Sequence, residues 1–213
     1  MDSNEIIIEP ALRGEWGIFN PPGHPKLAYD FLAVNEKKSP YIKGSMAKHL
    51  FSFINVSETC AWSKPVFSPV DGEVIASHDG ETDRTKISFI YDLFRLLINK
   101  PKEEDGFGAF GGNHVLIRFN DIYVLLCHLK MHSLTVKKGD KVTAGQKLGE
   151  VGNSGSSIQP HLHLQVMKDA SYFPLFENLL PYKFTRSEVK EKESWVTEQN
   201  VSLTNGGHYY FGE

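Results

Sequence analysis

The sequence of 213 residues holds only two cysteines, Cys60 and Cys127, and neither lies in a CxxC pair. This argues against a disulfide framework and a cysteine zinc site, and we expect free or buried thiols. No apolar run is long enough to span a bilayer, and the acidic start MDSNEIIIEPALRGEW does not fit a secretory signal peptide. We expect no integral membrane segment, and a chain that is cytoplasmic as synthesised or exported by a route that the sequence does not reveal.

The sequence also lacks a charge excess of either sign. Its formal net charge is −3, with 40% hydrophobic and 23% charged residues, as in ordinary globular proteins. This balance suggests neither nucleic acid nor an anionic membrane surface as a partner. The length predicts one domain that carries insertions.

Short strands punctuated by glycine and proline predict an all-β sandwich or barrel. NHVLIRF alternates polar and apolar residues, and IYVLLCHL is a short apolar run of strand length. Two segments, SMAKHLFSFIN and TKISFIYDLFRLLINK, instead have apolar residues at helical spacing, which predicts helical insertions packed on the β core. KPKEEDGFGAFGG predicts a mobile loop. The segment from Thr185 is expected to be extended and docked by its aromatic residues, Trp195, Tyr209, Tyr210 and Phe211.

The stretch HLHLQV at 161–166 alternates strictly, as a half-buried strand does. Alternation puts His161, His163 and Gln165 on one face of that strand. Two neighbouring histidines on one face are either a solvated pair or part of a metal site. The rest of the chain has to decide between these two interpretations.

Other histidines sort by context. His128 follows Cys127 on an apolar run, so alternation predicts that the two side chains point to opposite faces. His49 is expected to be an ordinary surface residue of the first helix. A catalytic zinc site needs three nitrogen or oxygen ligands and one open position for water. His24, Asp30 and one histidine of the HxH pair can supply this set if distant segments converge. Ordinary roles are expected for His78, His114 and His208.

Several motifs together resemble the lysostaphin-type, or LytM-like, zinc metallopeptidases. They are a GN-strand at GNHVLIRF, a strand ending in His-Leu at YVLLCHL, the block VKKGDKVTAGQKLGEVGNSG and the later PHLH. Upstream, KLAYDF and VFSPVDGEV are similar to the zinc-aspartate segment of that family and the strand after it. The resemblance covers roughly residues 23–168.

The resemblance implies that His24, Asp30 and His163 bind one zinc ion (Zn²⁺), and that His161 and His128 stay off the metal and perform the proton chemistry. The first motif departs from the family, because five residues lie between His24 and Asp30 (H-x5-D) where H-x3-D is common. The implied activity is that of a zinc metalloendopeptidase. Its expected partner is a peptide or peptidoglycan substrate, cleaved at cross-links or glycine-rich bridges of the bacterial cell wall by a zinc-activated water.

The fold that the resemblance implies is mainly β, an antiparallel β-sandwich or barrel-sandwich hybrid with a duplicated hybrid motif and short helical insertions. The expected organisation is an N-terminal extension at 1–14, a LytM-like peptidase domain at 15–182 and a C-terminal tail at 183–213 packed on that domain. Insertions are expected at about 35–64 and 84–112, and the segments around 46–55 and 84–112 are expected to form the walls of a substrate groove.

Three alternatives stay open at this stage: an inactive LytM-like regulatory or scaffold domain, a biotinyl- or lipoyl-like carrier domain, and a storage or structural metal site. All five polar positions are filled, which argues against the first. Lys130 precedes the glycine-rich block, and a carrier leaves the histidines unexplained, which argues against the second. The scissile bond and the oligomeric state cannot be read from the sequence.

Overall fold

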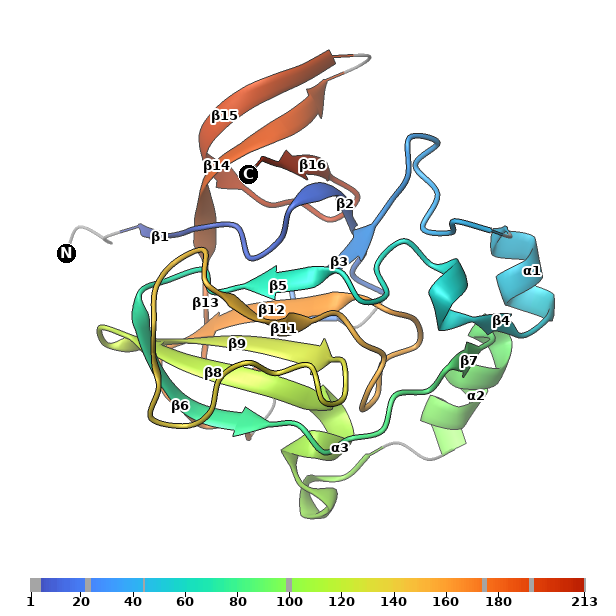
Figure 1. Cartoon of the computed structure of the whole chain (residues 1–213), viewed down its shortest axis with the longest axis horizontal. Helices are drawn as coiled ribbons and strands as arrows, with labels where there is room; N and C mark the ends of the chain where they lie inside the picture. Colours follow the sequence, from blue (N-terminus) through green and yellow to red (C-terminus); the bar gives the residue numbers. More distant parts are fainter. Residues whose placement is uncertain are drawn as a thin grey trace.

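The computed structural model describes residues 5–21, 24–43, 45–98, 101–173, 176–191 and 194–212. Within these residues most strands join one large sheet in the order β1-β14-β16-β2-β3-β12-β9-β8-β6-β10, with β13 beside β12 and β15 beside β14 (Figure 1). Two small sheets, β11-β5 and β4-β7, complete the β structure. The mainly β fold with short helical insertions that the sequence predicts is confirmed.

The strands have the following bounds: β1 Ile6–Ile8, β2 Gly14–Ile18, β3 Ala28–Ala33, β4 Ile54–Asn55, β5 Pro65–Phe67, β6 Gly72–His78, β7 Lys86–Ile87, β8 Asn113–Phe119, β9 Ile122–Leu129, β10 Lys141–Val142, β11 Lys147–Glu150, β12 Leu162–Met167, β13 Leu179–Leu180, β14 Tyr182–Glu191, β15 Ser194–Ser202 and β16 His208–Phe211. The helices are α1 Met46–Phe51, α2 Phe89–Ile98 and α3 Phe107–Gly111, with 3-10 turns η1 Val56–Glu58 and η2 Glu103–Asp105.

The main core lies between the large sheet and the small β11-β5 sheet. Leu162 and Leu164 of β12 face this core together with Val66 of β5 and Leu148 of β11. The alternate residues of β12 therefore face the other way, which is the expected consequence of a two-residue side-chain period. The apolar half of the alternating stretch anchors β12 in the core, and the polar half is left to form a site.

A bulge in β9 corrects one prediction about His128. Between the pairs Asn113–Leu129 and Val115–Leu126, β9 has one residue more than β8, and the backbone φ of His128 is 61°. A bulge of this kind interrupts the alternation of faces. Cys127 lies directly opposite His163, and the His128 ring also lies beside the His163 ring, 6.0 Å between centroids. The two side chains therefore share a side of the sheet, and the prediction of opposite faces is wrong.

The two predicted helical insertions are confirmed as α1 and α2, which project together from one end of the sheet (Figure 1). Their expected packing on the β core is wrong for α2, because Phe94 and Leu97 are exposed. Ser45 accepts a hydrogen bond from the Lys48 amide and so caps the start of α1. The prediction that His49 is a surface residue is wrong, because His49 is fully buried and its Nδ1 lies 2.6 Å from the Tyr41 hydroxyl. Tyr41 comes from outside the helix, so the helical pattern alone could not reveal this contact.

Two further segments differ from simple expectations. The glycine-rich stretch predicted as a loop holds η2 and the short helix α3 within its described part, while Lys100 lies outside the described residues. The C-terminal segment forms β14, β15 and β16, of which β16 pairs with β2 and β14 pairs with β1. Tyr209 and Phe211 are buried there, whereas Tyr210 is exposed beside Trp195. The division into extension, domain and tail stays a prediction.

The cysteines and the helices bear on two of the sequence-based expectations. Cys60 is half-buried and Cys127 is buried, and both are free thiols, as predicted. Among the described residues, no helix combines the length and apolar character that a membrane crossing requires.

Candidate functional site

Three neighbouring strands bring the predicted site residues together. Asp30 of β3 and His163 of β12 are direct cross-strand partners, although 133 positions separate them in the sequence. On the other side of β12, β9 contributes His128 next to the bulge. His24 precedes β3, and His161 immediately precedes β12. We call these five residues the histidine cluster: His24, Asp30, His128, His161 and His163.

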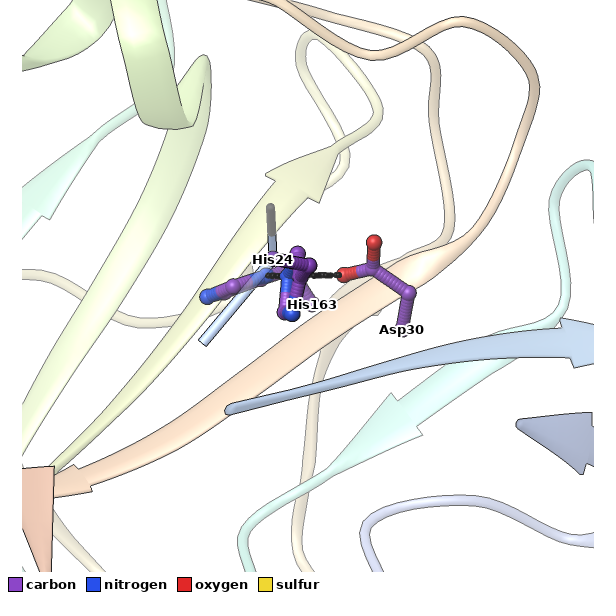
Figure 2. Close-up of side chains that lie close together, drawn as sticks. All are labelled: His24, Asp30 and His163. Carbon is purple, nitrogen blue, oxygen red and sulfur yellow. Dashed lines mark hydrogen bonds and ion pairs between the residues drawn. The ribbon is translucent and has the colours of Figure 1, made fainter. Parts of the chain in front are cut away.

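Imidazole nitrogens converge on a single oxygen of Asp30. Oδ1 of Asp30 lies 2.8 Å from Nδ1 of His163 and 3.4 Å from Nε2 of both His24 and His161. Nε2 of His24 also lies 3.4 Å from Nδ1 of His163. Figure 2 shows His24, Asp30 and His163 directed toward one another, and one potential ligand atom from each lies within 4.8 Å of the others.

The two imidazoles that are candidate ligands are held from outside by acceptors that the sequence did not reveal. Nδ1 of His24 donates to the carbonyl of Pro25 at 3.0 Å, and Nε2 of His163 donates to Oε1 of Gln165 at 2.9 Å. These oxygens can only accept, so each pairs with a protonated nitrogen. In the neutral form of both rings, the nitrogen that faces Asp30 then carries a lone pair. This is the orientation that an outer acceptor imposes on a metal-ligating histidine.

His161 and His128 are held in the same way. Nδ1 of His161 lies 2.8 Å from the Gln159 carbonyl, and Nδ1 of His128 lies 3.0 Å from the Ser154 carbonyl. The two rings lie 4.6 Å apart between centroids. Each ring therefore turns Nε2 away from its backbone acceptor, and for His161 that nitrogen faces Asp30. Backbone carbonyls fix the orientations of these two rings, so a pattern of side chains in the sequence could not predict them.

The electrostatics of the histidine cluster favour an ionised Asp30. Burial opposes ionisation, but His161 and the hydrogen bonds from the three surrounding histidines hold the pKa of Asp30 well below its usual value. Burial also acts on His161, yet the Asp30 carboxylate raises the pKa of that imidazole. Burial, with the positive potential of His161 and His163, lowers the pKa of His128 well below its usual value. The pKa values of the neighbouring His161 and His128 are thus shifted in opposite directions.

The donor set fits a metal ion. A neutral His163 that donates through Nε2 would place a lone pair 2.8 Å from an anionic oxygen, which is repulsive unless positive charge lies between them. That charge can be a second proton on the imidazole or a metal cation. Two histidines and one carboxylate are a suitable ligand set for zinc. The residues present therefore fit the group that the sequence motifs imply.

A cavity opens beside the histidine cluster. It has a volume of about 590 Å³, and His24 contributes to its wall. One side is formed by residues before and within β3, and the other side by the C-terminal segment. Its lining residues are Asn20, Pro21, His24, Lys26, Tyr29, Leu203, Thr204 and Asn205. None of these residues comes from the two helical insertions.

Comparison with known proteins identifies the class of the central segment. Residues 99–174 match Peptidase family M23. The matched segment holds His128, His161 and His163, whereas His24 and Asp30 lie before it. The resemblance to lysostaphin-type peptidases that the motifs indicate is confirmed.

Curated relatives carry the same class in their names. The peptidoglycan DD-endopeptidase ShyA of Vibrio cholerae is 38% identical over 82 residues, which is 35% of this chain and 19% of that protein. The glycyl-glycine endopeptidase ALE-1 of Staphylococcus capitis is 38% identical over 60 residues, 28% of this chain and 17% of that protein. The chain thus spans less than a fifth of the length of these two relatives.

Among solved structures, the catalytic domain of the antimicrobial peptidase lysostaphin from Staphylococcus simulans is similar over 74% of this chain and 80% of that domain. The sequence identity is 21% and the TM-score is 0.39.

Proposed function

We propose that this chain is a zinc-dependent endopeptidase that hydrolyses peptide bonds of bacterial cell-wall peptidoglycan. The observation that supports this best is the convergence of imidazoles on Asp30 Oδ1, each held by an acceptor on its outer nitrogen. The substrate class rests on the family match of residues 99–174 and on the names of the relatives.

His24, Asp30 and His163 are the proposed ligands of the metal. Bound zinc would act as a Lewis acid and lower the pKa of a coordinated water toward neutrality. The protein supplies the fixed geometry, because Gln165 and the Pro25 carbonyl hold the two imidazoles from outside. Asp30 adds the negative charge that makes the position attractive to a cation.

His161 and His128 are the proposed catalytic residues. Their Nδ1 atoms are engaged by the Gln159 and Ser154 carbonyls, which leaves Nε2 of each ring for the substrate. One ring can hold or return a proton, and the other can donate a hydrogen bond to the oxygen that becomes negative in the transition state. Nε2 of His161 lies as close to Asp30 Oδ1 as Nε2 of His24 does, so separating ligand from catalyst requires an experiment.

The experiment measures zinc content and peptide cleavage on the same preparations. We expect about one zinc per chain, new amino termini in digests of purified muropeptides, and loss of cleavage on chelation with recovery when zinc is restored. His163→Ala should lose zinc and cleavage together. The matched control is His78→Ala, because His78 is exposed and forms an ion pair with Glu81. This control should retain both properties.

Each alternative predicts a distinct result. Zinc binding without cleavage of any muropeptide would identify an inactive LytM-like domain. If His161→Ala removes zinc and His163→Ala does not, the ligand assignment is wrong. A chain that binds no zinc when it is adequately supplied would refute the proposal as a whole.

A further inference from the structure

Helix α2 buries its acidic residue and exposes most of its apolar ones. Asp92 is only 1% exposed, whereas Phe94 is 61% and Leu97 is 71% exposed. An amphipathic helix on the surface of a globular domain normally has the opposite arrangement. The orientation of α2 therefore calls for a physical cause and for something that its apolar side can contact.

The cause is a buried ionic cluster beneath the helix. Oδ1 of Asp92 lies 3.4 Å from Nε of both Arg84 and Arg95, and Oδ2 accepts a hydrogen bond of 3.0 Å from the Ser88 amide. Arg84 also donates to the carbonyls of Gly155 and Ser157. We call Arg84, Ser88, Asp92 and Arg95 the Asp92 cluster. Rotating α2 to bury its apolar side would expose this cluster and break its bonds, so the apolar side is fixed outward.

The exposed apolar surface extends over both helical insertions. Phe53, which follows α1, and Tyr91 of α2 have ring centroids 5.5 Å apart, which joins the two parts. A group of neighbouring exposed apolar side chains of this kind usually marks an interaction site. We call this surface the insertion face, and its exposed members are Ile42, Met46, Phe51, Phe53, Ile90, Tyr91, Leu93, Phe94, Leu97 and Ile98.

Exposed lysines lie beside the apolar residues of the insertion face. Residues 37–57 hold four lysines and no acidic residue, although the whole chain has a net charge of −3. Lys43 lies next to exposed Ile42, and Lys86 lies in β7. Lys48 lies in α1, where it forms an ion pair of 2.9 Å with Glu58, and all three lysines are exposed. An exposed apolar surface with lysines at its margin is complementary to an interface that is apolar and anionic.

We propose that the insertion face docks on the surface of an anionic lipid bilayer. Its aromatic and aliphatic side chains would enter the boundary between headgroups and acyl chains, and its lysines would contact acidic headgroups. With ten residues, α2 is too short to cross a bilayer and would lie in the interface plane. A second copy is a poorer occupant, because a two-fold interface sets one patch against itself and brings lysines of like charge together.

Docking is tested with the full chain and vesicles of stated composition. One set contains phosphatidylcholine alone, and the other contains equimolar phosphatidylcholine and phosphatidylglycerol. Co-sedimentation should be strong with the anionic vesicles, on the order of tenfold weaker with the neutral ones, and reduced by high salt.

Two pairs of matched variants locate the contact. Phe94→Ser with Leu97→Ser should reduce vesicle binding on the order of tenfold or more. Its control, Val196→Ser with Tyr210→Ser, removes exposed apolar groups elsewhere and should bind normally. Lys43→Glu with Lys86→Glu should also weaken binding, whereas Lys138→Glu with Lys141→Glu changes the same charge at exposed residues near β10 and should not. All of these positions are exposed, so each variant is expected to fold, which circular dichroism would check.

Three results would overturn the proposal. The first is the absence of binding to anionic vesicles by the folded chain. The second is equal loss of binding in the insertion-face variants and their controls. The third is a stable dimer in analytical ultracentrifugation that Phe94→Ser with Leu97→Ser converts to monomer, since a second copy would then be the occupant. None of these results depends on peptidase activity, so they can be separated from failure of the proposed function.

Discussion

The histidine cluster and the Asp92 cluster are both built around a carboxylate surrounded by nitrogen groups, but they differ in what is left unsatisfied. In the Asp92 cluster, both carboxylate oxygens have donors, and Arg84 and Arg95 carry permanent positive charge. In the histidine cluster, outer acceptors take one nitrogen of each ring, and the remaining nitrogens face inward. The first cluster is closed on itself, and the second is open to one more partner.

This difference explains why one cluster supports structure and the other is a candidate for chemistry. The closed Asp92 cluster fixes the orientation of α2. Any rotation of the helix would break its ion pairs and leave an uncompensated charge. In the open cluster, the inward-facing imidazole nitrogens and the Asp30 carboxylate can bind a cation or a substrate.

The largest expected effect on stability comes from opening the closed cluster. Asp92→Ala leaves two guanidinium groups without their carboxylate and should lower the free energy of unfolding by about 3 kcal/mol. Asp121→Ala, at an exposed turn between β8 and β9, is the control and should change it by less than about 0.5 kcal/mol. Urea titration measures both variants. Zinc content per folded chain should stay normal in Asp92→Ala, and a loss of zinc would remove the distinction between the two clusters.

The open cluster should respond in activity while retaining its metal. His161→Ala and His128→Ala should each keep near-normal zinc content and lose peptide cleavage on the order of a hundredfold. The double variant should lose less than the product of the two effects, if both residues act on one transition state. Metal analysis and cleavage rates on the same samples provide the measurement. Cleavage at the parent rate would assign a structural role to the residue concerned.

A smaller effect should follow from the acceptor behind His163. Gln165→Leu removes the oxygen that orients Nε2 of His163 and should weaken zinc affinity about 10–100-fold. Excess zinc should restore cleavage, which it would not do for His161→Ala. Gln199→Leu, at an exposed position of β15, serves as the control. Competition with a metal indicator measures the affinities, and equal affinity in Gln165→Leu and the parent would refute the role of this acceptor.

The smallest expected effect at neutral pH concerns a buried histidine outside both clusters, because it develops only on acidification. Burial lowers the pKa of His114 to about 4 from the ordinary value of 6.5. Between these values the unfolded chain binds the proton and the folded chain does not, so stability falls as the pH falls. The added slope should be at most about 1.4 kcal/mol per pH unit. It should disappear in His114→Gln, as urea titrations across this range would show, and parallel pH profiles would contradict the effect.

Short sequence patterns by themselves determined several features of this protein: the polar face of β12, the two helices and the resemblance to a peptidase family. Strict alternation at 161–166 placed His161, His163 and Gln165 on one face, because side chains of a strand alternate whatever the strand pairs with. The 3.6-residue period revealed α1 and α2 for a similar reason. The combined motifs indicated the resemblance to lysostaphin-type peptidases that the match of residues 99–174 confirms. Each of these signals is contained within a short stretch of chain.

Tertiary structure decided what depends on partners distant in sequence. The pairing of Asp30 with His163, the bulge that turns His128 toward them and the backbone acceptors behind the rings all arise from strand register and loop packing. The same holds for the outward apolar side of α2, because its helical period shows that two sides differ but not which one is buried. Arg84 holds Asp92 on the buried side, and Arg84 is itself bound to the carbonyls of Gly155 and Ser157, which lie 71 and 73 positions away in the sequence. The net charge likewise conceals the lysines of the insertion face, since a sum over the chain carries no information about position.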